Sequence, residues 1–152
     1  MTIRGARPEE LDLVRQLFRE YQQHIGVDLC FQSFEEELAG LPGKYAPPRG
    51  GLFLAWSGDA TAGCVAFRPI DDETAEMKRL YVRADHHGKG LGRRLADKIL
   101  NAAKKAGYRR VRLDTLPAMK DAIALYRKMG FEPIAPYTEN PVEGALFFEK
   151  TL

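Results

Sequence analysis

The sequence has little cysteine, and it contains no long apolar run. Its two cysteines, Cys30 and Cys64, have no spacing typical of a metal or redox site, so we expect reduced thiols in a cytoplasmic protein. The three histidines lack ligand partners at metal spacing, and no metal is predicted. No segment approaches the length of a membrane span, and the first residues do not resemble a secretory signal. We therefore expect no membrane partner.

A large charge of one sign is also missing. The 23 lysines and arginines nearly balance the 21 acidic residues, and the net charge of +2 does not indicate binding to nucleic acid. One basic cluster has no aromatic stacking set beside it: Lys104, Lys105, Arg109, Arg110 and Arg112. The length of 152 residues predicts one domain over 1–152, with a core of useful size.

Apolar periodicity and turn residues predict a mixed α/β fold. Helices are expected at 8–25, 33–40, 91–106 and 118–129. Strands are expected at 2–6, 52–56, 61–70, 76–82, 110–115, 131–134 and 145–150. The short breaks between the middle three strands favour an antiparallel meander, followed by a strand–loop–helix–strand unit, a helix and a hairpin. The stretch from Pro42 to Gly51 is rich in Pro and Gly and is expected to be a mobile surface loop.

The most informative stretch is DHHGKGLGRRLADKIL, residues 85–100. Gly88, Gly90 and Gly92 lie where an amphipathic helix begins. Backbone N–H groups at such a glycine-rich helix start can approach an anion closely, and the helix dipole favours negative charge there. The stretch therefore predicts an anion site, and the alternative is that the glycines only shape a loop.

Two common phosphate-binding loops do not fit this spacing. A nucleoside-triphosphate loop requires G-x-x-x-x-G-K-[ST], but Lys89 is followed by Gly90. The dinucleotide fingerprint requires a third glycine where Arg93 stands. Asp114 lies at the end of the next expected strand, where a ribose-binding acid would lie, so a dinucleotide-binding module is the weaker alternative.

The segment His87-Gly88-Lys89-Gly90-Leu91-Gly92 follows the expected strand EMKRLYV, and it resembles the [QR]-x-x-G-x-[GA] signature of the GNAT superfamily of acetyl-CoA-dependent N-acetyltransferases. LYRKMGF, residues 125–131, is similar to a later helix of that family. The order of the expected elements agrees over essentially the whole chain. The sequence departs from the family at His87, where Gln or Arg is usual, and at Met119, where many members have Asn.

This resemblance implies a GNAT-like mixed sheet of about seven strands, with an antiparallel meander, a splayed parallel pair and about four helices. It implies acetyl-CoA as co-substrate between the splayed strands. The pantetheine arm would pair with the backbone of Leu80, Tyr81 and Val82, like an added strand. The pyrophosphate would be bound at the loop and helix start, by His87, Gly88, Lys89, Gly90, Leu91, Gly92 and Arg93.

Two side chains are implied as catalytic. Tyr126 corresponds to the family tyrosine that points at the cofactor sulfur. Full proton transfer from a phenol to a thiolate is uphill by about 2 kcal/mol, so we expect a hydrogen bond from Tyr126 as charge builds on the sulfur. Glu76, or a water chain in its place, would accept the proton of the amine. Strict alternation places Glu76 on the same face as Lys78, Leu80 and Val82, and a bulge in this strand, which is usual in the family, would change that register.

The expected function is transfer of an acetyl group from acetyl-CoA to a primary amine of a small molecule or peptide, by direct attack. The alternative is a non-catalytic acyl-CoA sensor on the same fold, which would not need Tyr126. The expected acceptor site has an acidic excess that favours a cationic amine. Its candidate residues are His24, Asp28, Glu35, Glu36, Glu37, Tyr137, Glu139 and Glu143. The identity of the amine and the oligomeric state, a homodimer included, are left open by the sequence.

Overall fold

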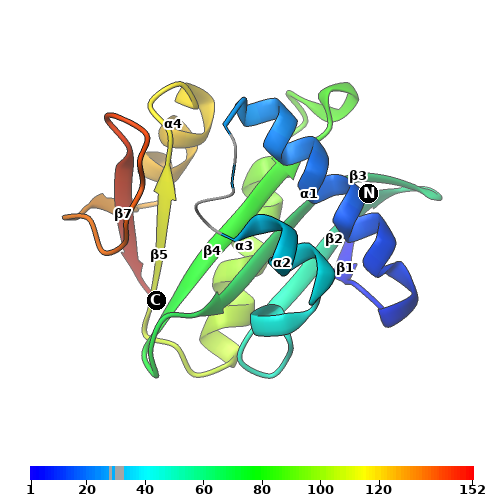
Figure 1. Cartoon of the computed structure of the whole chain (residues 1–152), viewed down its shortest axis with the longest axis horizontal. Helices are drawn as coiled ribbons and strands as arrows, with labels where there is room; N and C mark the ends of the chain where they lie inside the picture. The colour runs from blue at the N-terminus through cyan, green and yellow to red at the C-terminus, as the bar shows by residue number, and fades with distance from the viewer. Residues whose placement is uncertain (28, 30–32) are drawn as a thin grey trace.

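A computed structural model describes residues 1–27, 29 and 33–152, and shows one seven-stranded sheet with helices on both faces (Figure 1). The strands lie in the order β1-β2-β3-β4-β5-β7-β6. They are β1 (Thr2–Gly5), β2 (Gly51–Ser57), β3 (Ala60–Pro69), β4 (Thr74–Val82), β5 (Arg110–Thr115), β6 (Glu132–Pro133) and β7 (Leu146–Thr151). The α-helices are α1 (Leu11–Ile25), α2 (Phe34–Ala39), α3 (Leu91–Lys105) and α4 (Lys120–Lys128).

The predicted topology is confirmed. Strands β1 to β4 form an antiparallel meander, β4 pairs with β5 in parallel, and β7 pairs antiparallel with both β5 and β6. Helix α3 makes the crossover between the two parallel strands, as a parallel connection requires.

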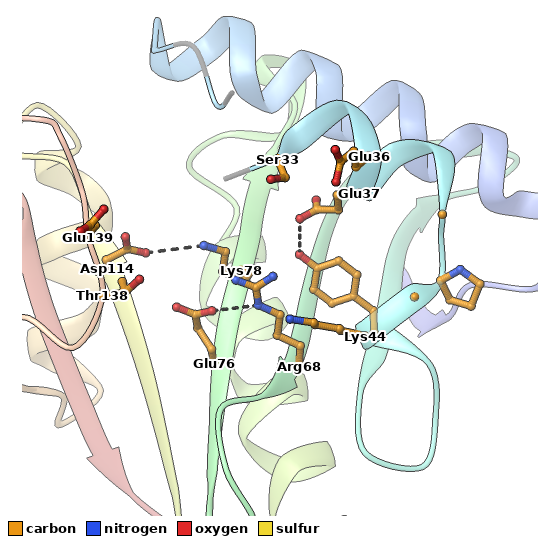
Figure 2. A pocket seen from close by; sticks show the side chains of 14 residues that line it. Ser33, Glu36, Glu37, Lys44, Arg68, Glu76, Lys78, Asp114, Thr138 and Glu139 are labelled. Atoms are coloured by element: carbon orange, nitrogen blue, oxygen red, sulfur yellow. Dashed lines mark hydrogen bonds and ion pairs between the residues drawn. The ribbon is translucent and has the colours of Figure 1, made fainter. Parts of the chain in front are cut away.

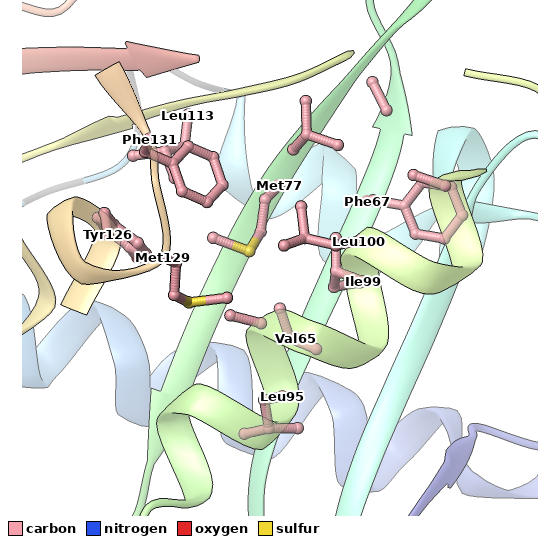
Figure 3. Close-up of a cluster of buried hydrophobic side chains, with 14 of the residues drawn as sticks. Val65, Phe67, Met77, Leu95, Ile99, Leu100, Leu113, Tyr126, Met129 and Phe131 are labelled. Atoms are coloured by element: carbon pink, nitrogen blue, oxygen red, sulfur yellow. The ribbon is translucent and has the colours of Figure 1, made fainter. Parts of the chain in front are cut away.

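Each face of the sheet carries its own hydrophobic core. Helices α1 and α2 bury Phe18, Phe34 and Leu38 against the meander on one face. On the other face, α3 buries one side of its amphipathic pattern with side chains from α4 and the sheet (Figure 3). Each large apolar side chain that is fully buried contributes about 1.5–3 kcal/mol. Strand β4 therefore runs through the middle of the molecule, with helices packed above and below it.

Two features of β4 separate it from its neighbours and shape the site. Its pairing with β5 covers only three residues of each strand, Thr74–Glu76 with Arg110–Arg112, and the strands diverge beyond them. Further along, Lys78 is opposite Ala66 and Tyr81 is opposite Cys64, so a β-bulge lies between these pairs. Arg79, in the bulge, has a φ of 61°, in the left-handed region.

The bulge changes which face each side chain of β4 occupies. Lys78 and Arg79 both lie on the α1–α2 face, whereas Leu80 and Val82 pack with the α3 core. Glu76 lines a pocket together with Lys78. Strict alternation therefore holds for Glu76 and Lys78 but fails for Leu80 and Val82, where the bulge changes the register.

The expectation of a surface loop from Pro42 to Gly51 was also wrong in part. Tyr45 is only 2% exposed, and its ring packs edge-to-face on Phe18 at a centroid distance of 6.1 Å. A large ring that can be buried outweighs the local preference of neighbouring Pro and Gly for irregular structure.

Across the described residues, no helix has the length and apolarity to span a membrane. Cys64 is a buried free thiol, and Cys30 lies outside the described residues.

Candidate functional site

The glycine loop forms one wall of an open cleft at the start of α3. The cleft has a volume of about 550 Å³, and its other walls come from the end of β4 and the start of α4. Gly88 and Gly90 have φ angles of +77° and +74°, which L side chains rarely adopt. A Cβ at either glycine would meet no protein atom within 4 Å. The loop therefore leaves its backbone accessible at the first turn of a 15-residue helix.

His87 ties this loop to the end of β4. Its Nε2 lies 2.7 Å from the backbone oxygen of Val82. Because a carbonyl oxygen only accepts hydrogen bonds, Nε2 is the donor. Leu80, Tyr81 and Val82 line the cleft beside this contact, so the structure brings them together with the glycine loop as predicted.

Two described residues that were predicted to bind the cofactor do not line this cleft. Lys89 and Arg93 are not among the described residues that line the cleft. Arg93 is half exposed and lies 3.6 Å from Asp97, one helical turn further along α3. A contribution of Lys89 and Arg93 to cofactor binding stays a prediction.

A narrow space between β4 and β5 continues from the cleft toward the sheet. Its lining includes Leu80 and Met119, which also line the cleft, and Tyr126 from α4. Tyr126 is 5% exposed, and its ring packs against Phe131 and Phe148 at centroid distances of 5.6 and 6.4 Å. Burial raises the pKa of Tyr126 well above that of a free phenol, so its hydroxyl remains a neutral donor.

Beyond this space lies a second, highly charged pocket with a volume of about 760 Å³. Lys78 and Asp114 line both the narrow space and this pocket, so the cleft, the narrow space and the pocket are neighbours along β4. Figure 2 shows the pocket between α2 on one side and the segment that follows β6 on the other. Its lining residues are Ser33, Glu36, Glu37, Gly40, Pro42, Gly43, Lys44, Tyr45, Arg68, Glu76, Lys78, Asp114, Thr138 and Glu139.

Three ion pairs organise this pocket. Arg68 Nε donates to Glu76 Oε1 at 3.0 Å, and these residues also face each other across the β3–β4 ladder. Lys78 Nζ lies 3.9 Å from an oxygen of Asp114. Arg79, on the bulge, donates through two nitrogens to the two oxygens of Glu37, at 3.0 and 3.1 Å. The pairs join β3, β4, β5 and α2 around one space.

Glu76 is buried among donors. The hydroxyl of Tyr137 donates to its second oxygen at 2.7 Å, in addition to the contact with Arg68. Burial by itself raises the pKa of Glu76, but the charge of Lys78 and the contacts with Tyr137 and Arg68 outweigh it, and the net pKa is lowered. Glu76 is therefore ionised at neutral pH and is a weak base.

Lys78 experiences the opposite balance. It is 6% exposed, and burial lowers its pKa although Glu76 and Asp114 both act to raise it. Asp114 also accepts a hydrogen bond from the Asn140 amide at 3.1 Å. The end of the charged pocket nearest Tyr126 is thus a buried lysine–aspartate pair.

The sequence predicted part of this pocket and missed most of its cations. Glu36, Glu37 and Glu139 line it, and Tyr137 contacts Glu76. The other candidates lie elsewhere: His24 lines the cleft, Glu35 pairs with Arg19, Glu143 is not among the lining residues, and Asp28 is outside the described residues. The missed charged or polar residues are Ser33, Lys44, Tyr45, Arg68, Lys78, Asp114 and Thr138, and the available signal was the pairing of Arg68 with Glu76 across two adjacent strands. Within the described part of the chain, no cluster of three or more His, Cys, Asp or Glu could hold a metal ion.

Known proteins share this sequence pattern and architecture. The model of the acetyltransferase (GNAT) family matches residues 11–131. An uncharacterized N-acetyltransferase of Schizosaccharomyces pombe is 40% identical over 142 residues, covering 92% of this chain and 87% of that protein. A crystal structure of an acetyltransferase from Streptococcus agalactiae has a TM-score of 0.81 at 21% identity, covering 99% of this chain and 98% of the other. The structure of yncA from Salmonella typhimurium with its cofactor acetyl-CoA has a TM-score of 0.76 at 20% identity, with coverages of 99% and 92%.

Proposed function

Because the chain belongs to the acetyltransferase (GNAT) family, we propose that it transfers an acetyl group from acetyl-CoA to a primary amine of a small molecule or peptide. The observation that carries this proposal is the position of Tyr126. It lines the narrow space that shares residues with the open cleft on one side and with the charged pocket on the other. A thioester that enters from the cleft and an amine that enters from the pocket would meet beside this hydroxyl.

The residues of the cleft fit acetyl-CoA as the co-substrate. The exposed backbone at Gly88 and Gly90 suits a pyrophosphate, because unpaired N–H groups at a helix start bind anions. The edge of β4 beyond Glu76 is not paired with β5, so its amide groups suit the amide-rich arm of the cofactor. We assign the pyrophosphate to residues 88–92 and the arm to Leu80, Tyr81 and Val82.

In the proposed reaction, the amine nitrogen bonds to the carbonyl carbon and the C–S bond breaks. One proton leaves the nitrogen and one is taken up by the sulfur, which gives the N-acetylated product and CoA. Tyr126 donates a hydrogen bond to the sulfur as negative charge develops there. The backbone N–H of Leu80 or Tyr81, at the bulge, is the donor assigned to the carbonyl oxygen.

Glu76 is assigned to the proton of the amine. It lines the charged pocket but is not among the described residues that line the narrow space, so a relay through one water suits its position. Its low pKa makes it a weak base. The nitrogen, however, becomes far more acidic once it bonds to the carbonyl carbon, and an ionised carboxylate can then accept its proton.

A thiol-release assay with acetyl-CoA and a panel of amines, polyamines, amino acids and peptides tests the proposal. Release of CoA that depends on one class of amine, with a product heavier by one acetyl group, is the expected result. Calorimetry of acetyl-CoA binding accompanies the assay. Binding without release for every amine would favour a non-catalytic acyl-CoA sensor, which needs the cleft but not Tyr126.

A further inference from the structure

Arg68 lies in the charged pocket with only part of its guanidinium engaged. Its Nε donates to Glu76, but no described residue accepts a hydrogen bond from either terminal nitrogen. The side chain is about one quarter exposed, at 26%. A guanidinium presents its donors in a planar fork that matches a carboxylate. The two terminal nitrogens of Arg68 are therefore available to an anionic group in the pocket.

Lys44 adds a second positive charge on the same side. It lies in the short turn after α2, and Figure 2 shows its side chain extending toward Arg68. Among the described residues, none forms an ion pair with Lys44. Thus one side of the pocket carries two cations with unused donors, whereas the buried cations Lys78 and Arg79 are each paired with an acid.

The opposite side of the pocket is acidic. Asp114 on β5 and Glu139 in the segment after β6 face the pocket across from Arg68 and Lys44 (Figure 2). Asp114 also lines the narrow space that contains Tyr126. Lys78 is paired with Asp114 here, but the two carboxylates exceed its single positive charge, so a positively charged amine is attracted to this side. The narrow space that Asp114 lines is the proposed site of acetyl transfer.

From this arrangement we propose that the acceptor is an amino acid or a close analogue, with a carboxylate and a primary amine in one small molecule. The carboxylate binds the terminal nitrogens of Arg68 and the ammonium of Lys44. The amine lies toward Asp114 and enters the narrow space. This inference rests on the proposed acetyl transfer and narrows its acceptor from amines in general to amines that carry a carboxylate.

The test compares acceptors that differ only in the carboxylate. Alanine, leucine, phenylalanine, methionine and glutamate are each assayed beside their α-carboxamide, by CoA release, for kcat/KM. We expect the wild type to prefer the best free acid over its amide by roughly tenfold to a hundredfold, the scale of a charge-assisted hydrogen bond. The amide has the less basic amine, which is neutral more often, so this difference works against the expected preference.

Two variants test whether Arg68 and Lys44 cause the preference for the free acid. Arg68→Gln should bring the acid-to-amide ratio near one, and Lys44→Glu, at an exposed position, should lower the ratio several-fold because the new charge repels the carboxylate of the acid and attracts the cationic amide. Lys104→Glu, the same charge change at an exposed position of α3, is the matched control and should leave the ratio intact. If Arg68→Gln fails to fold, Lys44→Glu decides the question.

The two ways of failing are distinct. Acetylation of amides or simple amines at least as efficient as that of free acids, with a ratio unaffected by Lys44→Glu, would overturn the amino-acid assignment and leave acetyl transfer standing. Absence of CoA release with the acids, the amides and the broad amine panel would overturn acetyl transfer and the amino-acid assignment together.

Discussion

The open cleft and the charged pocket lie along the same strand, β4, but they are built from different parts of the chain. The cleft is formed largely by backbone and apolar side chains around Gly88 and Gly90. The pocket is formed by ion pairs that join β3, β4, β5 and α2. A site made of backbone groups suits one fixed ligand group, such as a pyrophosphate. A pocket made of paired side chains can be adapted to a different acceptor by amino-acid substitution. This difference agrees with the proposed function, in which the cleft binds acetyl-CoA and the pocket binds the acceptor amine.

Removal of the hydroxyl where the two sites meet should have the largest effect. Tyr126→Phe keeps the ring that packs on Phe131 and Phe148 and deletes only the donor. We expect turnover to fall by roughly 10- to 1,000-fold, because the donor acts only as charge develops on the sulfur. Acetyl-CoA affinity, measured by calorimetry, should barely change. Wild-type turnover in this variant would show that Tyr126 is only a core residue.

A change confined to the backbone site should impair binding alone. Gly90→Val places a branched side chain in the open cleft at a φ of +74°, and we expect the Kd for acetyl-CoA to rise by about tenfold or more. Gly58→Val is the control, because Gly58 has a φ of +63° and equally open surroundings in the β2–β3 turn. Both variants should lose similar stability, but only Gly90→Val should lose affinity. An unchanged Kd in folded Gly90→Val protein would contradict the placement of the pyrophosphate.

A change confined to the charged pocket should depend on pH. Glu76→Gln should lower kcat by about tenfold near pH 7, less than most general bases contribute, because the lowered pKa of Glu76 makes it a weak base. The deficit should shrink as pH rises and hydroxide removes the proton of the attacking nitrogen instead. Tyr126→Phe should show no such recovery. A Glu76→Gln deficit that is constant from pH 7 to pH 10 would exclude the role in proton transfer.

The folding stability of the protein at low pH should also depend on Glu76. The folded-state pKa of Glu76 lies below its ordinary value, so its ionised contacts stabilise the protein fully above about pH 5 and are lost as pH falls through the lowered pKa. The Tm difference between the wild type and Glu76→Gln should therefore be greatest near neutral pH and shrink in acid. Equal differences at pH 7 and pH 3 would show that Glu76 does not contribute through its charge.

The smallest effect is expected at the junction of the loop with β4. His87→Arg retains a donor that can reach the Val82 oxygen, so acetyl-CoA affinity should stay equal or improve by no more than about twofold. His87→Ala removes the donor and should weaken binding several-fold. A large loss of affinity in His87→Arg, measured by calorimetry, would show that the histidine has a separate function.

The sequence by itself determined the parts of this protein that depend on local chemistry. Gly88 and Gly90 adopt conformations that other residues rarely accept, and the apolar spacing from Leu91 onward has one face to bury, so the loop and α3 follow from neighbouring residues. The end of α4 is also determined locally, because Gly130 follows the helix with a φ of +91°, which favours glycine. These local signals carried the prediction of the fold and of the cofactor side of the site.

Only the tertiary structure decided how the charged pocket is assembled. The bulge at Arg79 places two consecutive cations of β4 on one face, and the divergence after Glu76 opens the space that Tyr126 enters from α4. Arg68 and Asp114 reach the pocket from different strands, and Tyr45 and Lys44 reach it from a turn that sequence alone treats as surface. Strand register, bulge position and long-range burial are set by contacts between distant segments, so local propensity could not specify them.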